Sequence, residues 1–294
     1  MTAVKRVILC SNPYRDKGFA AAKEAERILR ESGIETIYCL PFKLDNSDMQ
    51  FNVPLRPLQQ EIRSTDLVIS FGGDGTILHL ARAAAMRGVP VLGVNLGSLG
   101  FMSDLEVSEM ELLRRLAKGQ YRVERRMMLD AVVKREGRVV YSASGLNDAV
   151  VTKGAIARIV RLQVTADQDQ LGVFSGDGVV VATPTGSTGY SLSAGGPIVE
   201  PTAQNFIISP ICAHSVISKS FVLSADGTVT IAPTESNRKQ VYLSVDGGRA
   251  FALRSGDKVC VSRSRYTTEL LRLTDRNVYQ ILRKKMTGGI GHEE

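Results

Sequence analysis

A glycine-rich turn places a carboxylate where phosphate chemistry would need one. Residues 70–76 read SFGGDGT, between an apolar run at 67–71 and a helical pattern at 76–87. Glycines let the backbone approach a phosphate closely, and free N–H groups at the start of a helix complement negative oxygens. Asp74 would repel phosphate unless a divalent cation or an incoming hydroxyl lies between them. A phosphoryl-transfer enzyme needs such a carboxylate to accept the hydroxyl proton or to hold Mg²⁺.

The turn by itself leaves a second interpretation open. Its spacing matches neither the GxxxxGK[ST] loop nor the GxGxxG dinucleotide fingerprint. It could be a tight turn in which Asp74 is only the N-cap of the following helix.

Two later segments carry polar groups suited to a nucleotide. Asn147 and Asp148 precede a predicted strand, and an adjacent amide and carboxylate can grip a ribose diol, although an Asx turn has the same spacing. Residues 175–197 are dense in Gly, Ser and Thr, so we expect them to lie outside the core and to bind a polar ligand. Tyr190 within this segment offers an aromatic face for a base.

The first 120 residues alternate between strand and helix patterns, which predicts an α/β domain with a parallel sheet. From residue 121 to 270 short strands follow one another closely, which predicts a β-rich, mostly antiparallel domain. Residues 271–294 form a C-terminal segment with a helix at 277–286, expected to pack back on the first domain. The predicted strands are 4–10, 34–39, 67–71, 89–94, 122–133, 138–143, 148–152, 159–165, 178–182, 222–223, 229–231, 241–245, 250–253 and 258–261, and the earlier helices are 19–29 and 76–87.

Composition narrows the class of protein. The 294 residues, 44% of them hydrophobic, exclude a disordered chain and suggest two domains. The net charge of +7 favours an anionic partner or is a surface bias, and no basic run interleaved with aromatics indicates nucleic acid. The four cysteines are scattered without metal-ligand spacing, and no apolar run could cross a membrane. We therefore expect a cytoplasmic protein with free thiols.

Several motifs, in order along the chain, resemble those of the NAD kinases. Residues 71–76 look like the GGDGT signature, which lipid kinases and phosphofructokinases share in looser form. The segment 95–101 (NLGSLGF), also readable as a plain connector, resembles NLGxLGF, and 146–148 resembles LN[DE]. Residues 175–197 resemble GDG…TPTGSTAYSLSAGGP over nearly their whole length, 209–215 resemble TPICPHS and 245–248 resemble VDGQ. The resemblance implies the two-domain fold of the NAD kinases.

The resemblance also implies site residues. Asp74 would be the general base, Asp177 would contact the nicotinamide side and residues 188–193 the adenosine side of the nucleotide. Gly189 stands where the family usually has Ala, with no expected loss of binding, whereas Gly248 puts the contact of the last VDGQ residue in doubt. The role of His214 stays open. The implied nucleotide-contacting set is Gly72, Gly73, Asp74, Gly75, His79, Asn147, Asp148, Arg158, Asp177, Thr185, Thr188, Gly189, Tyr190, Ser191, Leu192 and Ser193.

The implied reaction phosphorylates the adenosine ribose 2′-hydroxyl of NAD to give NADP. ATP or inorganic polyphosphate would be the donor, with Mg²⁺ arriving largely on its phosphates. A homodimer or homotetramer would be usual for the family. The alternatives are a lipid or sphingoid-base kinase that shares GGDGT, for which no membrane-surface helix is apparent, and a non-catalytic NAD(P)-binding module.

Overall fold

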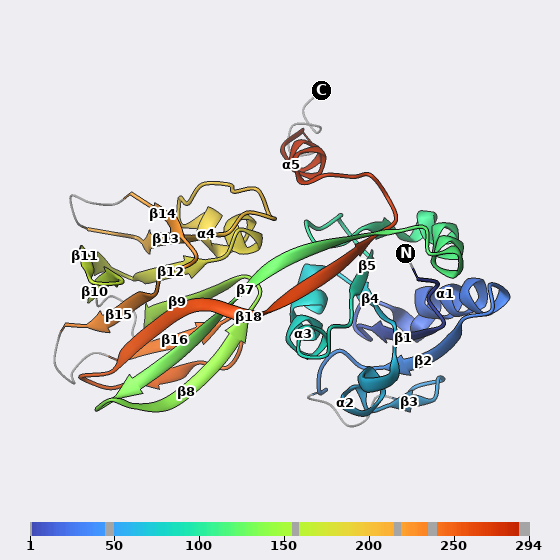
Figure 1. Cartoon of the computed structure of the whole chain (residues 1–294), viewed down its shortest axis with the longest axis horizontal. Coiled ribbons are helices and arrows are strands. Elements are labelled where there is room, and N and C mark those ends of the chain that lie inside the picture. The colour runs from blue at the N-terminus through green and yellow to red at the C-terminus, as the bar shows by residue number, and fades with distance from the viewer. Residues whose placement is uncertain (1, 45–49, 155–158, 215–218, 235–239, 288–294) are drawn as a thin grey trace. The chain divides into compact units, whose positions relative to one another are not determined.

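The computed structural model describes residues 2–44, 50–154, 159–214, 219–234 and 240–287. The chain divides into two compact units (Figure 1). Unit 1 comprises Met1–Arg125 and Thr268–Glu294, and unit 2 comprises Arg126–Thr267. No helix in the described part of the chain has the length and apolar character needed to span a membrane.

Unit 1 is an α/β domain with a parallel sheet, as the sequence predicts. Its strands follow the order β3-β2-β1-β4-β5, and each neighbouring pair is parallel. The apolar strands β1, β4 and β5 are buried almost throughout because helices cover them. The strand bounds are β1 (Arg6–Ser11), β2 (Glu35–Cys39), β3 (Leu55–Arg56), β4 (Leu67–Gly72), β5 (Val91–Asn95) and β6 (Leu105–Glu106), which pairs with β5.

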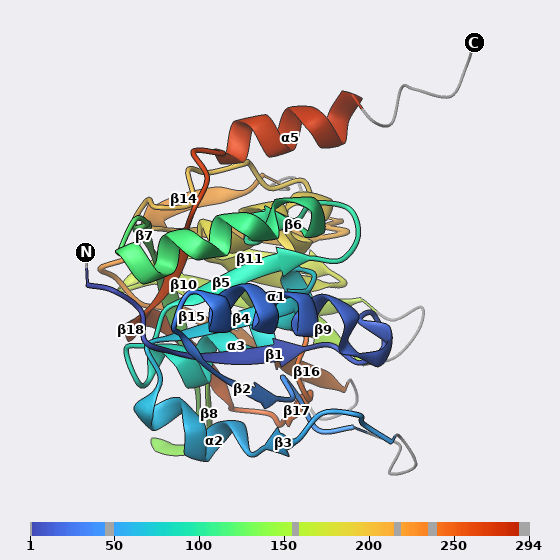
Figure 2. The ribbon, with the colours of Figure 1, turned by 90° about the vertical axis from the view of Figure 1, so that its right-hand side faces the viewer.

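Helices lie on both faces of this sheet. The segments α1 and η3 pack together on one face and enclose an apolar core with β1 and β4, while α3 lies on the other face (Figures 1 and 2). Gly33 and Gly88, both at positive φ, follow α1 and α3. The helical bounds are η1 (Lys17–Phe19), α1 (Ala20–Glu31), α2 (Leu58–Glu61), η2 (Ile62–Ser64), α3 (Asp74–Ala85), η3 (Val107–Lys118) and α5 (Val278–Thr287).

Unit 2 is built of two β layers around one apolar core, which confirms a β-rich second domain. One layer is an antiparallel sheet in the order β14-β13-β12-β9-β16-β17, with β12 and β9 at its centre. Its strands are β9 (Asp148–Lys153), β12 (Gly178–Ala182), β13 (Asn205–Ile211), β14 (Phe221–Ser224), β16 (Val241–Val245) and β17 (Phe251–Leu253).

The other layer of unit 2 contains the antiparallel run β11-β10-β15-β18, and β7 pairs with β18 and β8. The strands β7 and β18 are long and continue into unit 1, where Leu270 of β18 pairs with Val91. The bounds are β7 (Arg122–Arg135), β8 (Arg138–Gly145), β10 (Val160–Ala166), β11 (Asp169–Gly176), β15 (Val229–Pro233) and β18 (Lys258–Arg272).

The sequence interpretation was wrong about part of the hydroxyl-rich segment. The predicted strand 178–182 is confirmed as β12, but the segment does not lie outside the core, because this strand is buried and so are Thr183, Thr185, Ser187 and Ser191. The hydroxyl groups did not prevent burial because hydrogen bonds inside the unit satisfy them. The sequence interpretation also missed β11 and β13, and β18 is longer than predicted.

Candidate active site

Asp74 is fixed by a neighbouring loop rather than used as a helix cap. Strand β4 ends at Gly72, Gly73 is the N-cap of α3, and Asp74 is the first helical residue. Its Oδ2 accepts the Phe101 N–H at 2.7 Å, and its Oδ1 accepts the Met102 N–H at 3.1 Å and the Ser103 N–H at 3.3 Å. The carboxylate is therefore held in one orientation at the end of a buried strand, where open α/β sheets bind ligands.

The NLGSLGF segment lies beside the GGDGT turn because Gly100 allows close approach, and Gly72 has a similar role within the turn. A Cβ at Gly100 would overlap the Asp74 carboxylate, and a Cβ at Gly72 would overlap the Thr76 side chain. The segment is thus more than a plain connector. It supplies the N–H groups that orient Asp74.

The C-terminal segment of unit 1 forms hydrogen bonds with the loop that binds Asp74, through the carbonyl groups of that loop. The Arg272 side chain is buried, and its Nη1 donates to the Met102 carbonyl at 2.8 Å and to the Ser103 carbonyl at 3.3 Å. The Asp104 carboxylate accepts the Leu273 N–H at 2.7 Å. Residues 272–274 therefore fix the peptide groups whose other side binds Asp74.

A cavity of about 460 Å³ opens beside Asp74 and lies wholly within unit 1. The GGDGT turn and the loop containing Ser98 form part of its wall. The side chains of Arg15, His79 and Lys285 also line it, so cationic or titratable nitrogen groups surround the cavity. His79, which the family resemblance implies as a nucleotide contact, lines the same cavity as Asp74.

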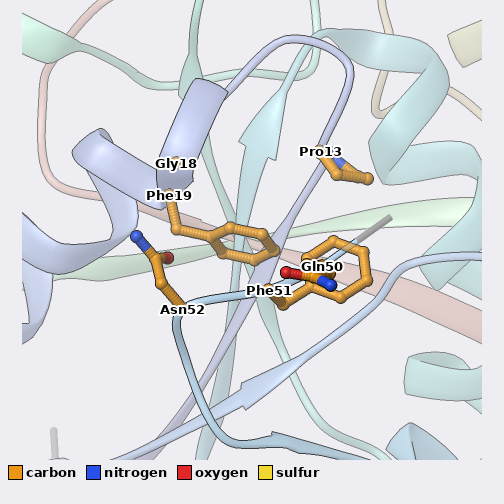
Figure 3. A pocket seen from close by; sticks show the side chains of 6 residues that line it. All are labelled: Pro13, Gly18, Phe19, Gln50, Phe51 and Asn52. Carbon is orange, nitrogen blue, oxygen red and sulfur yellow. The ribbon is translucent and has the colours of Figure 1, made fainter. Parts of the chain in front are cut away.

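A second cavity of unit 1, of about 380 Å³, carries no ionisable group among its lining residues (Figure 3). The rings of Phe19 and Phe51 meet edge to face at 5.6 Å within it. We assign no chemistry to this cavity.

In unit 2 the Asn147-Asp148 turn is held from two sides. The Asp246 carboxylate accepts the N–H groups of Leu146 at 2.7 Å, Asn147 at 2.8 Å and Asp148 at 3.0 Å. On the other side, the Thr183 N–H donates to the Asn147 carbonyl at 2.8 Å. The turn is therefore held by distant residues, and no Asx hydrogen bond is found among its described contacts.

Two acceptors in this turn lack protein donors among the described residues. The Asn147 Oδ1 is buried and has no hydrogen-bond partner. Burial, and secondarily the charge of Asp246, raises the pKa of Asp148 to about 7. A buried acceptor without a donor costs about 1–3 kcal/mol, so this pair is suited to receive hydroxyl groups from a ligand.

The segment predicted to contact the adenosine side passes directly by Asn147. It contains η4 (Thr185–Thr188) and α4 (Tyr190–Ser193). A Cβ at Gly189 would lie 3.5 Å from Asn147 Nδ2 and 3.3 Å from the Gly186 carbonyl, so the methyl usual in the family nearly fits. Tyr190, Leu192 and Ser193 are exposed.

Some side chains of this segment point inward. The Ser191 hydroxyl is buried and lies 3.0 Å from Ser209 Oγ, and Thr185 Oγ1 accepts a hydrogen bond from Arg126 Nη1 at 3.3 Å. These two hydroxyls stabilise the segment. Thr188 and Gly189 are half-buried, and Gly189 is the one that lies near Asn147.

Asp177 lies at the opposite end of β12 from this turn. Its Oδ1 forms an ion pair of 2.6 Å with Lys153 Nζ. Asp148 pairs with Ala182, so the two acidic residues are separated by about 17 Å along the strand, at about 3.4 Å per residue. Burial raises the pKa of Tyr190, and the charges of Cys212, Asp177 and Asp148 raise it further.

The structure gives little evidence on the roles of the three other residues that the sequence singled out, Arg158, His214 and Gly248. Arg158 lies outside the described residues. The backbone of His214 donates to the Ser175 carbonyl at 2.8 Å. Gly248 is exposed, and its N–H closes a turn with the Val245 carbonyl at 2.8 Å. Sequence reasoning missed Lys153, Asp246, Arg272 and Lys285, although the VDGG motif contained a signal, since Asp246 takes a positive φ before Gly247.

Comparison with known proteins identifies the family. The ATP-NAD kinase N-terminal domain matches residues 7–121, and the ATP-NAD kinase C-terminal domain matches residues 146–273. The NAD kinase of Caldanaerobacter subterraneus is 41% identical over 287 residues, covering 97% of this chain and 99% of the relative. The NAD kinase of Natranaerobius thermophilus is 43% identical over 225 residues, covering 76% and 78% of the two chains.

Solved structures agree with this comparison. The crystal structure of yeast NADH kinase complexed with NADH has a TM-score of 0.81 and 27% identity, covering 100% of this chain and 90% of that chain. An NAD kinase from Archaeoglobus fulgidus in complex with ATP shares the fold, with a TM-score of 0.73 and 23% identity over 96% and 98% of the two chains. With matches over both units and in both kinds of comparison, the chain belongs to the ATP-NAD kinase family.

Proposed function

We propose that this phosphotransferase moves the terminal phosphoryl group of ATP, or of inorganic polyphosphate, to the adenosine ribose 2′-hydroxyl of NAD, giving NADP. The observation that carries the proposal is the Asp74 carboxylate, held by three backbone N–H groups at the edge of a cavity lined by Arg15 and Lys285. The Ser103 hydroxyl also donates to Asp74 Oδ1 at 3.4 Å, whereas Oδ2 accepts one hydrogen bond among the described residues, from Phe101. A carboxylate oxygen has two acceptor directions, so one direction of Oδ2 remains for a hydroxyl.

Asp74 acts as the general base in this reaction. It takes the proton of the 2′-hydroxyl while the 2′-oxygen bonds to the terminal phosphorus, and the bond from that phosphorus to the bridging oxygen of the donor breaks. Such a base contributes about 10²–10⁴-fold to the rate. Positioning of the two substrates supplies much of the remainder.

The described residues suit a metal ion that comes with the donor. Asp74 is the one carboxylate lining the cavity, and no group of three metal-binding side chains occurs within the described ranges. Mg²⁺ usually keeps several waters and is held by one or two carboxylates plus substrate phosphates. Bound to the donor phosphates, Mg²⁺ would neutralise charge that develops during transfer.

Unit 2 binds NAD through groups that need hydroxyl or amide partners. Asn147 Oδ1 and the Asp148 carboxylate accept the hydroxyls of the adenosine ribose, and the Tyr190 ring packs on the base. Asp177, about 17 Å along the strand, takes the nicotinamide end. The buried, partnerless Asn147 Oδ1 supports this assignment. The expected cytoplasmic location and homo-oligomeric state stay predictions.

The test is NADP formation by the purified full chain with NAD, ATP and Mg²⁺, detected with an NADP-specific dehydrogenase. Asp74→Asn should lose at least about 10²-fold in kcat and keep its affinity for NAD. Turnover of diacylglycerol without NADP formation would favour the lipid-kinase alternative, and NAD binding without any turnover would favour a binding module.

A further inference from the structure

Two cations that line the Asp74 cavity have no ion-pair partner among the described residues. Arg15 is exposed, and its Nη1 would lie 3.4 Å from a Cβ at Gly97, in ordinary van der Waals contact. Lys285 lies on α5, with its Nζ 5.3 Å from the centre of the Phe101 ring. Both reach the same cavity as Asp74.

Lys284, the residue before Lys285, provides a contrast. Its Nζ forms an ion pair of 3.1 Å with Glu106 Oε1. Consecutive residues on a helix point in directions about 100° apart, so only Lys285 faces the cavity. The helix thus presents one neutralised lysine and one lysine without a carboxylate partner.

This distribution of charge indicates an anionic ligand of more than one charge. Like charges that share a cavity repel each other, and a polyanion removes that repulsion. The N-terminus of α3 adds a positive dipole end in the same wall, at Gly75 and Thr76. The cavity volume of about 460 Å³ is large enough for several linked phosphates.

We propose that Lys285 and Arg15 bind the phosphate chain of the donor, and that the C-terminal helix α5 is therefore part of the donor site. This inference rests on the proposed function. The ligand is a run of phosphoanhydride-linked phosphates, found both in a nucleoside triphosphate and in inorganic polyphosphate. Lys285 also packs on Phe101, whose N–H donates to Asp74, so the bound phosphates lie next to the base.

The experiment compares Lys285→Gln with Lys284→Gln in the full chain. Hydrogen bonds to charged groups contribute about 1.5–3 kcal/mol, so the KM for ATP should rise about tenfold or more in Lys285→Gln. The KM for NAD should stay within about twofold because Lys285 does not touch NAD in this assignment. Lys284→Gln should keep the wild-type KM for ATP, and Lys285→Arg should restore most of the loss. Arg15→Gln should repeat the effect of Lys285→Gln.

Direct binding separates the donor sources and separates this inference from the proposed function. Calorimetric titration with ATP and with tripolyphosphate should show weaker binding of both by Lys285→Gln. If only ATP binds wild-type protein, the donor is a nucleotide, and if both bind, the phosphate chain is enough. Unchanged ATP binding in Lys285→Gln, or an equal loss in Lys284→Gln, would overturn the inference. Wild-type protein that binds tripolyphosphate through Lys285 but forms no NADP would leave this site standing and refute the proposed function.

Discussion

The Asp246 carboxylate accepts the backbone N–H of Asn147 at 2.8 Å across 99 residues of sequence. The same carboxylate holds the N–H groups of Leu146 and Asp148. Gly145 makes this approach possible, because a Cβ there would lie 2.8 Å from Asp246 Oδ1. Asp246 is thus a positioning residue that orients the amide and carboxylate proposed to bind ribose.

Asp246→Asn should weaken NAD binding without affecting the binding of the phosphoryl donor. The amide replaces one acceptor oxygen with a donor, so at least one N–H of the turn loses its partner, at about 1–3 kcal/mol. We expect the KM for NAD to rise about tenfold or more and the KM for ATP to stay near the wild-type value. Asp226→Asn, in an exposed ion pair with Arg263, is the matched control. Equal changes in both KM values would show that Asp246 only stabilises the fold.

The proposed role of Asp148 predicts that NAD affinity depends on pH. Burial, and then the charge of Asp246, raises the pKa of Asp148 to about 7, and the ionised carboxylate accepts stronger hydrogen bonds from the ribose hydroxyls than the neutral acid does. Affinity for NAD, titrated without a donor, should therefore rise by roughly tenfold from about pH 6 to about pH 8. Asp148→Asn should show a flat profile, and a pH dependence equal to that of the wild type would contradict the assignment.

The same carboxyl affects stability with a definite sign. The pKa of Asp148 is higher in the folded chain than its ordinary value of 3.8, so the folded state binds more protons between about pH 4 and about pH 7. The contribution to the free energy of unfolding is full below this window and is lost as pH rises through it. The denaturant concentration at the unfolding midpoint should therefore fall in wild-type protein, relative to Asp148→Asn, as pH rises through this range. The difference between the two proteins should become constant above about pH 7.

Gly100 and Gly97 belong to one motif but should respond differently to alanine. A methyl at Gly100 overlaps the Asp74 carboxylate, whereas one at Gly97 lies 3.4 Å from the end of the flexible Arg15 side chain. A shift of the base by about 1 Å can cost about 10²-fold in rate. Gly100→Ala should therefore lose that much kcat, while Gly97→Ala stays within a few-fold. Comparable kcat values for the two variants would show that the position of Asp74 does not limit the rate.

Local patterns predicted most of the strands and helices. The apolar run at 67–71 predicted β4 because a strand buried on both faces is apolar throughout. The helical spacing after it predicted α3 because a helix buried on one face has apolar residues on that face. Strand β13 was not predicted, and it contains Pro210, a residue type that sheet interiors usually exclude. The structure tolerates Pro210 because β14 pairs only with residues 205–208, so one edge of β13 needs no N–H there.

Long-range contacts set the limit of prediction for the site. The motifs marked Asp74 and Asn147 but not the residues that orient them, because Asp246 and Arg272 lie 99 and 170 residues from their partners. Hydroxyl content also misled the prediction of burial, since the Thr183 hydroxyl bonds the Leu146 carbonyl at 2.5 Å inside the unit. A local pattern shows which groups can do chemistry, whereas burial depends on partners supplied elsewhere in the chain.

Arg272 should affect turnover although it does not touch Asp74. Its Nη1 holds the Met102 and Ser103 carbonyls at 2.8 and 3.3 Å, and the N–H groups of these same residues bind Asp74. Its Nη2 also donates to Glu124 at 3.2 Å. Arg272→Lys keeps the buried charge but cannot reproduce these directed bonds, because an ammonium lacks the planar fork of a guanidinium.

For Arg272→Lys we therefore expect a drop in kcat of about tenfold, KM values within about threefold, and a lower melting temperature, from the loss of one or two hydrogen bonds. Arg125→Gln is the control, because Arg125 forms an exposed ion pair with Glu269 and should contribute at most about 1 kcal/mol. Stability and turnover separate the two possible roles. If a second-site stabilising substitution restores the melting temperature of Arg272→Lys together with its full kcat, Arg272 supports the fold alone. If kcat stays low in the restabilised protein, the guanidinium positions the loop that holds the base.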